Sequence, residues 1–212
     1  VTGVQTCALP IWEKKYQDAT NYLDQALKID KNNSELYFNY GTLLLAKEEF
    51  KRAKDYFLLC IKHNPQNHQA YFNAAFACYK NKDINLAIDL YAEAIKLNPF
   101  YFEAFNNRGL MYQDLRFNHL ALEDFKQAVK INPYFAEAYN NLASLQIKIK
   151  DFGSAKSSLE KAINIKPNYP EAYNNMGAMC GELLDYDAEI GRAHVWTPVT
   201  PISRMPSSAW KK

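Results

Sequence analysis

Apolar residues recur three or four positions apart along most of this chain, in blocks of about a dozen residues separated by short polar breaks. One block places Tyr71, Ala75 and Cys78 on a single helical face, and the next block does the same with Ala87 and Tyr91. This spacing is typical of amphipathic helices. Each second block ends at Asn-Pro or Lys-Pro, because proline cannot continue a helix. The pattern therefore predicts an all-α chain built from pairs of helices.

The helix pairs repeat every 34 residues. The repeat is marked by prolines at 65, 99, 133 and 167, by rings at 37, 71, 105, 139 and 173, and by glycine or alanine four residues after each ring. Further columns in the same phase are Ala53, Ala87, Ala121 and Ala155, then Phe57, Tyr91, Phe125 and Leu159, then Cys60, Ala94, Ala128 and Ala162. A small residue lets two helices approach closely, and a ring fills the space beside it. Such a period indicates a repeat architecture.

These columns closely resemble the tetratricopeptide repeat, a helix–turn–helix unit. The resemblance implies a right-handed α-solenoid of stacked 34-residue hairpins, each touching only its neighbours. We expect a domain over 12–188, consisting of a half repeat at 12–33, complete repeats at 34–67, 68–101, 102–135 and 136–169, and a truncated repeat at 170–188. Its lone outer helices are expected at about 12–30 and 170–184. Apolar faces without a partner at both ends indicate a fragment of a longer array.

The two terminal segments, 1–11 and 189–212, do not continue the repeat pattern. Both resemble translated sequencing adaptor rather than natural protein. We therefore expect residues 1–11 and 189–212 to be non-native and exclude them from the fold prediction.

Composition excludes several classes of function. The 212 residues carry 25 Lys+Arg against 23 Asp+Glu, so net charge gives no case for binding nucleic acid or a membrane surface. No apolar run approaches the roughly 20 residues of a membrane span. Four cysteines in so long a chain form no disulfide framework. Cys60, Cys78 and Cys180 occupy small-residue columns, so we expect buried thiols and a reducing compartment, the cytoplasm.

The sequence contains no pattern of residues associated with catalysis. It has no phosphate-binding loop, nucleophile elbow or dinucleotide fingerprint, and its carboxylates are scattered over solvent-facing positions. His63 and His68 flank a turn with no cysteine at a metal-ligand spacing. We therefore expect no enzyme activity in this chain, no cofactor and no metal.

The resemblance places the first helix of each repeat on a concave wall, where the exposed positions face a ligand. The sixth position of every first helix is asparagine: Asn39, Asn73, Asn107, Asn141 and Asn175. A carboxamide both donates and accepts hydrogen bonds, so this column is suited to pairing with a peptide backbone. Alternatively, the asparagines hydrogen-bond the adjacent repeat.

Two further columns distinguish one part of the groove from another. Phe38 and Phe72 at the fifth position, with Phe76 nearby, predict an apolar anchor for a ligand, although packing between repeats is an equally simple explanation. Glu103 and Glu137 belong to a nearly uniform acidic second position. Acid near a helix start is favoured by the helix dipole alone, but it also makes one rim of the groove attractive to a basic peptide.

The predicted function is a protein–protein interaction scaffold that binds a peptide or partner protein in this groove. The alternative is the substrate-recognition arm of a larger enzyme, such as a glycosyltransferase of the O-linked N-acetylglucosamine type. Chaperone adaptors of the same family clamp a C-terminal carboxylate with basic residues at fixed positions. Here those positions hold Phe38, Glu103 and Asn107, so a chaperone carboxylate clamp is not expected.

Overall fold

The computed structural model describes the backbone of residues 5–195 and the side-chain surroundings of residues 15–184. The described backbone contains ten helices and no strand, which confirms the all-α prediction. The helices are α1 (Gln5–Ile29), α2 (Ser34–Ala46), α3 (Phe50–His63), α4 (His68–Lys80), α5 (Ile84–Leu97), α6 (Phe102–Asp114), α7 (Asn118–Ile131), α8 (Ala136–Lys148), α9 (Phe152–Ile165) and α10 (Pro170–Val195).

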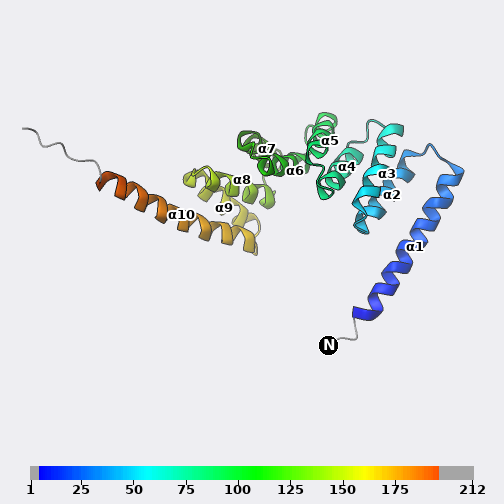
Figure 1. Cartoon of the computed structure of the whole chain (residues 1–212), viewed down its shortest axis with the longest axis horizontal. Helices are drawn as coiled ribbons and strands as arrows, with labels where there is room; N and C mark the ends of the chain where they lie inside the picture. The colour runs from blue at the N-terminus through cyan, green and yellow to red at the C-terminus, as the bar shows by residue number, and fades with distance from the viewer. Residues whose placement is uncertain (1–4, 196–212) are drawn as a thin grey trace, which may run out of the picture.

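The middle eight helices form four consecutive hairpins, which stack side by side into an elongated solenoid (Figure 1). The hairpins are α2–α3, α4–α5, α6–α7 and α8–α9. First helices contact one another between most successive repeats, as α2 does with α4, α6 with α8, and α8 with α10, whereas α4 and α6 make no comparable contact. Consecutive second helices make no comparable contact within the described chain. We call the side of the stack formed by the first helices its inner wall, because successive repeats lie closer together there than on the side of the second helices.

In the first and third hairpins, the two helices pack closely where a glycine faces a ring. A Cβ atom added to Gly41 would lie 2.8 Å from the ring of Phe57, and one added to Gly109 would lie 2.8 Å from the ring of Phe125. Both rings are completely buried. The predicted alanine columns are completely buried as well, since Ala53, Ala87, Ala121, Ala155 and their partners at 94, 128 and 162 all have no exposed surface. Glycine at 41 and 109 is therefore required by the close approach of the two helices.

The turn inside each hairpin has the same backbone geometry in all four repeats. A non-glycine residue adopts a left-handed conformation at 34-residue intervals: Glu48, Lys82, Arg116 and Lys150, with φ between 59° and 66°. In the first turn, the backbone amide of Glu48 donates to the Leu45 carbonyl, and that of Glu49 donates to the Leu44 carbonyl. This is the Schellman pattern that closes the C-terminus of a helix.

Each turn between hairpins begins at the residue before one of the prolines that repeat every 34 positions. The side-chain oxygens of Asn64, Asn98 and Asn132 each accept a hydrogen bond from the backbone amide two residues later, at 3.0–3.2 Å. Such turns reverse the chain and fix where the next first helix begins. In the fourth repeat, Lys166 stands in place of the asparagine, so this turn carries a cationic side chain.

The outer helices are longer than predicted. The first begins at Gln5 rather than near residue 12, and the last continues to Val195 rather than ending near 184. Residue 184 is in phase with the four left-handed turn residues, but neither a proline nor a turn interrupts the helix there. Of the segments predicted to be adaptor, 5–11 and 189–195 are thus helical, while 1–4 and 196–212 lie outside the described residues. The structure does not test their origin.

Candidate functional site

The asparagine column of the first helices is partly joined into the solenoid. Asn141 Nδ2 on α8 donates to Asn106 Oδ1 on α6 at 2.9 Å, and Asn175 Nδ2 on α10 donates to Asn140 Oδ1 on α8 at 2.8 Å. The acceptors are buried, whereas the donors are half-buried. The sixth position therefore bonds to the fifth position of the preceding repeat, so both lie between adjacent first helices on the inner wall.

The other three asparagines of the column have different surroundings. Asn107 donates to the Tyr91 hydroxyl at 3.3 Å and accepts from the Asn106 amide, also at 3.3 Å, because the fifth position one repeat earlier is phenylalanine. Asn39 is exposed and Asn73 half-buried, and neither has a hydrogen-bond partner among the described residues. The column thus divides into members bonded within the protein at 107, 141 and 175 and two members whose carboxamides are free.

The predicted aromatic anchor consists of half-buried rings with intramolecular contacts. Phe38 packs edge-on against Phe57, with ring centroids 5.7 Å apart. Phe72 packs edge-on against Tyr91 at 5.4 Å and stacks on Tyr101 at 4.7 Å. The ammonium of Lys80 lies 5.4 Å from the ring centroid of Phe76 (a residue one turn beyond Phe72 on α4). These rings serve packing within and between repeats, and each keeps part of its surface exposed.

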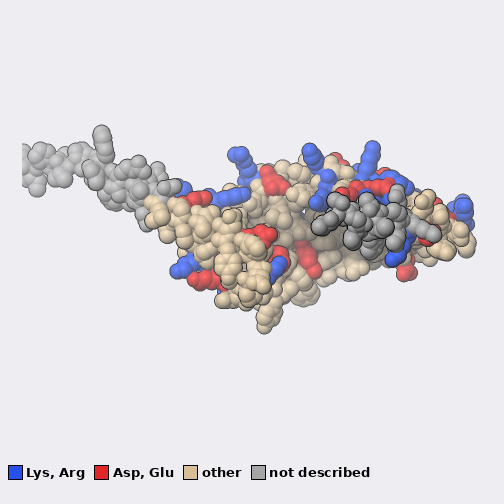
Figure 2. Space-filling model, turned by 90° about the horizontal axis from the view of Figure 1, so that it is seen from below, with Lys and Arg blue, Asp and Glu red and all other residues tan. Residues whose placement is uncertain are grey.

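The acidic rim differs between repeats. Glu137 Oε1 lies 3.1 Å from Lys166 Nζ, and the same ammonium lies 4.5 Å from the ring centroid of Tyr169. Glu103 forms no ion pair among the described residues. Burial raises the pKa of the Tyr101 phenol to about 12, and the nearby Glu103 carboxylate adds to this shift. In Figure 2, Lys and Arg project mainly along one edge, while uncharged residues cover most of the face shown.

Family models of the tetratricopeptide repeat match residues 13–59, 68–101, 102–135 and 136–169, which together make up most of the chain. The chain belongs to the tetratricopeptide repeat (TPR) family. No curated protein sequence shows significant similarity to it.

Solved structures of TPR proteins have the same fold. MamA is 22% identical, with a TM-score of 0.70 over 73% of this chain and 91% of its own. YrrB, described as a TPR protein with an unusual peptide-binding site, is 23% identical, with a TM-score of 0.68 over 82% of this chain and 90% of its own. The first TPR of Spaghetti (RPAP3), bound to the HSP90 peptide SRMEEVD, is 23% identical, with a TM-score of 0.54 over 56% of this chain and 94% of its own.

Two polar pairs inside the TPR hairpins were not predicted from the sequence. Arg108 donates two hydrogen bonds to the Asp124 carboxylate, at 2.7 and 2.8 Å. Burial raises the pKa of Asp124, and the bonds from Arg108 oppose that shift. Ser158 Oγ donates to Gln146 Oε1 at 2.8 Å, and both residues are buried. The sequence signal was a polar residue, Arg108 or Gln146, in a column that is otherwise free of charged and amide side chains, opposite a second-helix column that holds Asp124 and Ser158 in successive repeats.

The cysteine prediction holds for two residues out of three. Cys60 and Cys78 are buried, and burial raises the pKa of the Cys78 thiol to about 11. Cys180 is exposed, so the prediction that it is buried is wrong. The reason is that α10 continues straight on instead of turning back, and no second helix covers the Cys180 face within the described chain. The raised thiol pKa keeps Cys78 protonated and inert near neutral pH.

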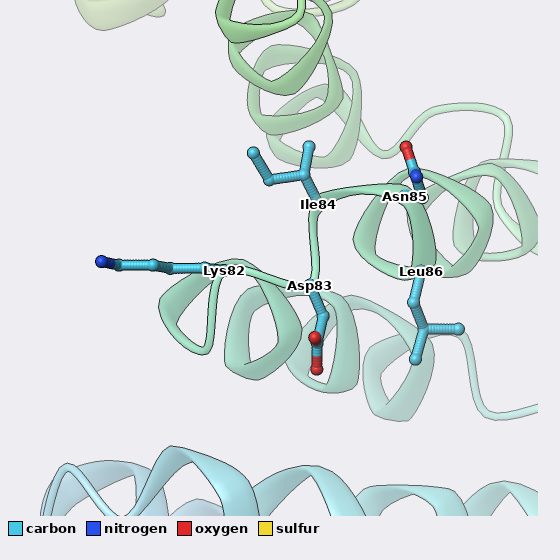
Figure 3. Close-up of a pocket in the computed structure, with 5 residues that line it drawn as sticks. All are labelled: Lys82, Asp83, Ile84, Asn85 and Leu86. Carbon is cyan, nitrogen blue, oxygen red and sulfur yellow. The ribbon is translucent and has the colours of Figure 1, made fainter.

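A surface depression of about 450 Å³ lies at the turn that precedes α5, lined by residues 82–86 (Figure 3). Its side chains point in different directions and do not converge on a common centre, and Asp83 is engaged with Lys54 at 3.6 Å. The described residues contain no cluster of His, Cys, Asp or Glu suited to a metal. Within that same part of the chain, no helix combines the length and apolar character needed to cross a bilayer. The inner wall of the TPR solenoid therefore remains the candidate site.

Proposed function

We propose that this chain is a protein-interaction scaffold that binds a peptide or partner protein along the wall formed by α2, α4, α6, α8 and α10. The observation that carries the proposal is the pair of free carboxamides in the first two repeats. Asn39 and Asn73 present donors and acceptors without a partner, next to the partly exposed rings of Phe72 and Phe76. Polar groups able to pair with a peptide backbone thus adjoin an apolar surface, a combination that peptide-binding grooves use.

The hydrogen-bonded asparagines of the column have a smaller role in peptide binding than Asn39 and Asn73. Asn141 and Asn175 use an amide N–H within the protein, so each has an oxygen left to accept a bond from a peptide N–H. Backbone recognition is therefore concentrated at 39 and 73, with acceptor oxygens continuing along the later repeats.

Two similar structures support peptide binding. YrrB is described as having a peptide-binding site, and the Spaghetti TPR holds a peptide that ends in a carboxylate. We propose an internal peptide segment for this chain instead, because the acid Glu103 stands at one of the positions where a carboxylate clamp needs a base. No observation favours the recognition arm of a glycosyltransferase over a stand-alone scaffold, since most of the asparagine column serves packing between repeats. The proposed groove lies within residues 34–184, so it is independent of the origin of the terminal segments 1–11 and 189–212.

The proposal can be tested by selecting binders from a randomised twelve-residue display library on the immobilised chain. Selected peptides are then measured by fluorescence anisotropy against two matched variants. Asn73→Ala removes a free carboxamide from the inner wall, whereas Asn85→Ala removes an exposed one from α5, on the outer layer. We expect Asn73→Ala to weaken binding by about 1 kcal/mol, roughly fivefold, and Asn85→Ala to leave it unchanged. Failure to select any peptide, or equal effects of both variants, contradicts the proposal.

A further inference from the structure

In the fourth repeat, a lysine of the chain itself contacts both a carboxylate and a ring at the protein surface. Glu137 lies in the first turn of α8, Lys166 caps the end of α9, and Tyr169 follows three residues later. The Lys166 ammonium lies 3.1 Å from Glu137 Oε1 and 4.5 Å from the Tyr169 ring centroid. An ammonium that contacts an aromatic face and a carboxylate together is stabilised by both.

The third repeat has the same carboxylate and a ring, but no lysine. The residues 34 positions earlier are Glu103, Asn132 and Phe135. Asn132 cannot replace the lysine, because it carries no charge and its Oδ1 accepts a bond from the Tyr134 backbone amide at 3.0 Å. Phe135 is half-buried and packs edge-on against Phe102, with centroids 5.0 Å apart. The repeat symmetry therefore puts a carboxylate and a ring at the positions of Glu137 and Tyr169, with no lysine at the position of Lys166.

Within residues 15–184, no cation compensates Glu103. Arg108 lies on the same helix, but both of its hydrogen bonds go to the Asp124 carboxylate, and its guanidinium lies over the rings of Phe105 and Tyr112. The described residues show no ion pair to Glu103. The same combination is absent from the other two complete repeats, because the second repeat has Gln69 in place of the acid and the first has Asn67 in place of the ring. The unfilled carboxylate–ring pair is thus a particular property of the third repeat.

We infer that Glu103 and Phe135 form a subsite for a lysine or arginine side chain of the bound peptide, which takes the position that Lys166 takes in the next repeat. This inference rests on the proposed peptide-binding function and specifies one feature of its ligand. The occupant is a basic side chain because Lys166 shows which chemistry this arrangement holds, and because an uncompensated carboxylate attracts a positive charge.

The test uses two pools of fluorescein-labelled ten-residue peptides, randomised over uncharged residues around one fixed central residue. That residue is lysine in one pool and its uncharged isostere norleucine in the other. We expect the wild-type chain to bind the lysine pool about fivefold more tightly, with the difference shrinking as salt is added. Glu103→Gln is expected to abolish the preference without affecting binding of the norleucine pool.

The repeat symmetry supplies two matched variants. Asn132→Lys places a lysine where Lys166 stands in the next repeat, so it should fill the subsite and abolish the preference while Glu103 is still present. Lys166→Asn should remove the internal cation from Glu137 and Tyr169, which creates a second subsite and increases the preference for lysine. Melting temperatures check that each variant folds. Equal binding of the two pools by the wild type, or a preference that survives Asn132→Lys, overturns the subsite but leaves the groove intact. Absence of binding by either pool overturns the proposed function together with this inference.

Discussion

The side-chain amide of Asn141 donates a 2.9 Å hydrogen bond to Oδ1 of Asn106, thirty-five residues earlier in the chain. Asn175 and Asn140 repeat the bond one hairpin further on. Because successive hairpins touch only their neighbours, each such bond contributes directly to an interface on which the stability of the solenoid depends. The first two repeats have phenylalanine, Phe38 and Phe72, at the fifth position and so offer no such acceptor; the carboxamides of Asn39 and Asn73 are free, whereas Asn107 bonds to the Tyr91 hydroxyl instead.

Removing one of these bonds should destabilise the protein. Asn141→Ala leaves the oxygen of the buried Asn106 without its partner, and we expect the free energy of unfolding to fall by about 1–3 kcal/mol. Asn39→Ala is the matched control, because that exposed carboxamide has no partner, and its effect should stay within about 0.5 kcal/mol. Urea unfolding followed by circular dichroism measures both. Equal losses of stability for the two variants would show that the hydrogen bond from Asn141 to Asn106 does not stabilise the interface between repeats.

Two glycines at the same position of their repeats should respond oppositely to alanine. A Cβ atom at Gly109 would come within 2.8 Å of the buried Phe125 ring, so Gly109→Ala should cost about 1–3 kcal/mol. A Cβ atom at Gly177 meets nothing within 4 Å, so Gly177→Ala should stabilise α10 by about 0.5–1 kcal/mol. The comparison is a pair of thermal unfolding curves. If Gly109→Ala also raises the melting temperature, the two helices do not pack as closely as described.

The left-handed turn residues offer a route to higher stability. Arg116 has a φ of 62°, a conformation that costs a non-glycine residue about 1 kcal/mol and glycine almost nothing. Arg116→Gly should therefore increase the free energy of unfolding by roughly that amount. Lys126→Gly, at an exposed position inside α7, should lower it by about 1 kcal/mol. Denaturant midpoints of the two variants should move in opposite directions, and a loss of stability for both would exclude the left-handed conformation at 116.

Alkaline pH should destabilise the fold through its buried tyrosines. Burial raises the pKa of Tyr101 to about 12 from 10.0, and it raises the pKa of Tyr91 as well. In this range the folded chain retains protons that the unfolded chain has lost. Stability is therefore complete below about pH 10 and falls as pH rises toward 12. Urea midpoints across this range test the expectation, and Tyr101→Phe should make the fall shallower. A midpoint that stays constant up to pH 12 would contradict it.

The regular part of the fold was predictable because it depends on residue size at fixed spacing. The pairs Gly41–Phe57 and Gly109–Phe125 and the buried alanines determine where two helices meet, and the prolines determine where each hairpin ends. The outer helices were not predictable in the same way, since nothing in the local sequence of α10 resists helix beyond residue 184. The predicted burial of Cys180 is wrong for the same reason, since it requires a second helix that the described chain does not place against α10.

The candidate site was predictable in position but not in its contacts. A column of identical asparagines indicates a shared role, yet the partner of each depends on its neighbours in space. Asn141 bonds to the asparagine one repeat earlier. Asn73 and Asn107 both follow a phenylalanine, and only Asn107 finds another partner, the Tyr91 hydroxyl. Likewise, Glu103 and Glu137 belong to one sequence column, and only the three-dimensional position of Lys166 shows that they differ in charge compensation.

The central claim is that the inner wall of first helices, and not the outer layer, is the binding surface. Amide hydrogen exchange, read by mass spectrometry with and without a selected peptide, tests it most directly. The account predicts that added protection falls on α2, α4, α6 and α8, strongest around Asn39 and Asn73. Protection concentrated instead on α3, α5, α7 and α9 would contradict it.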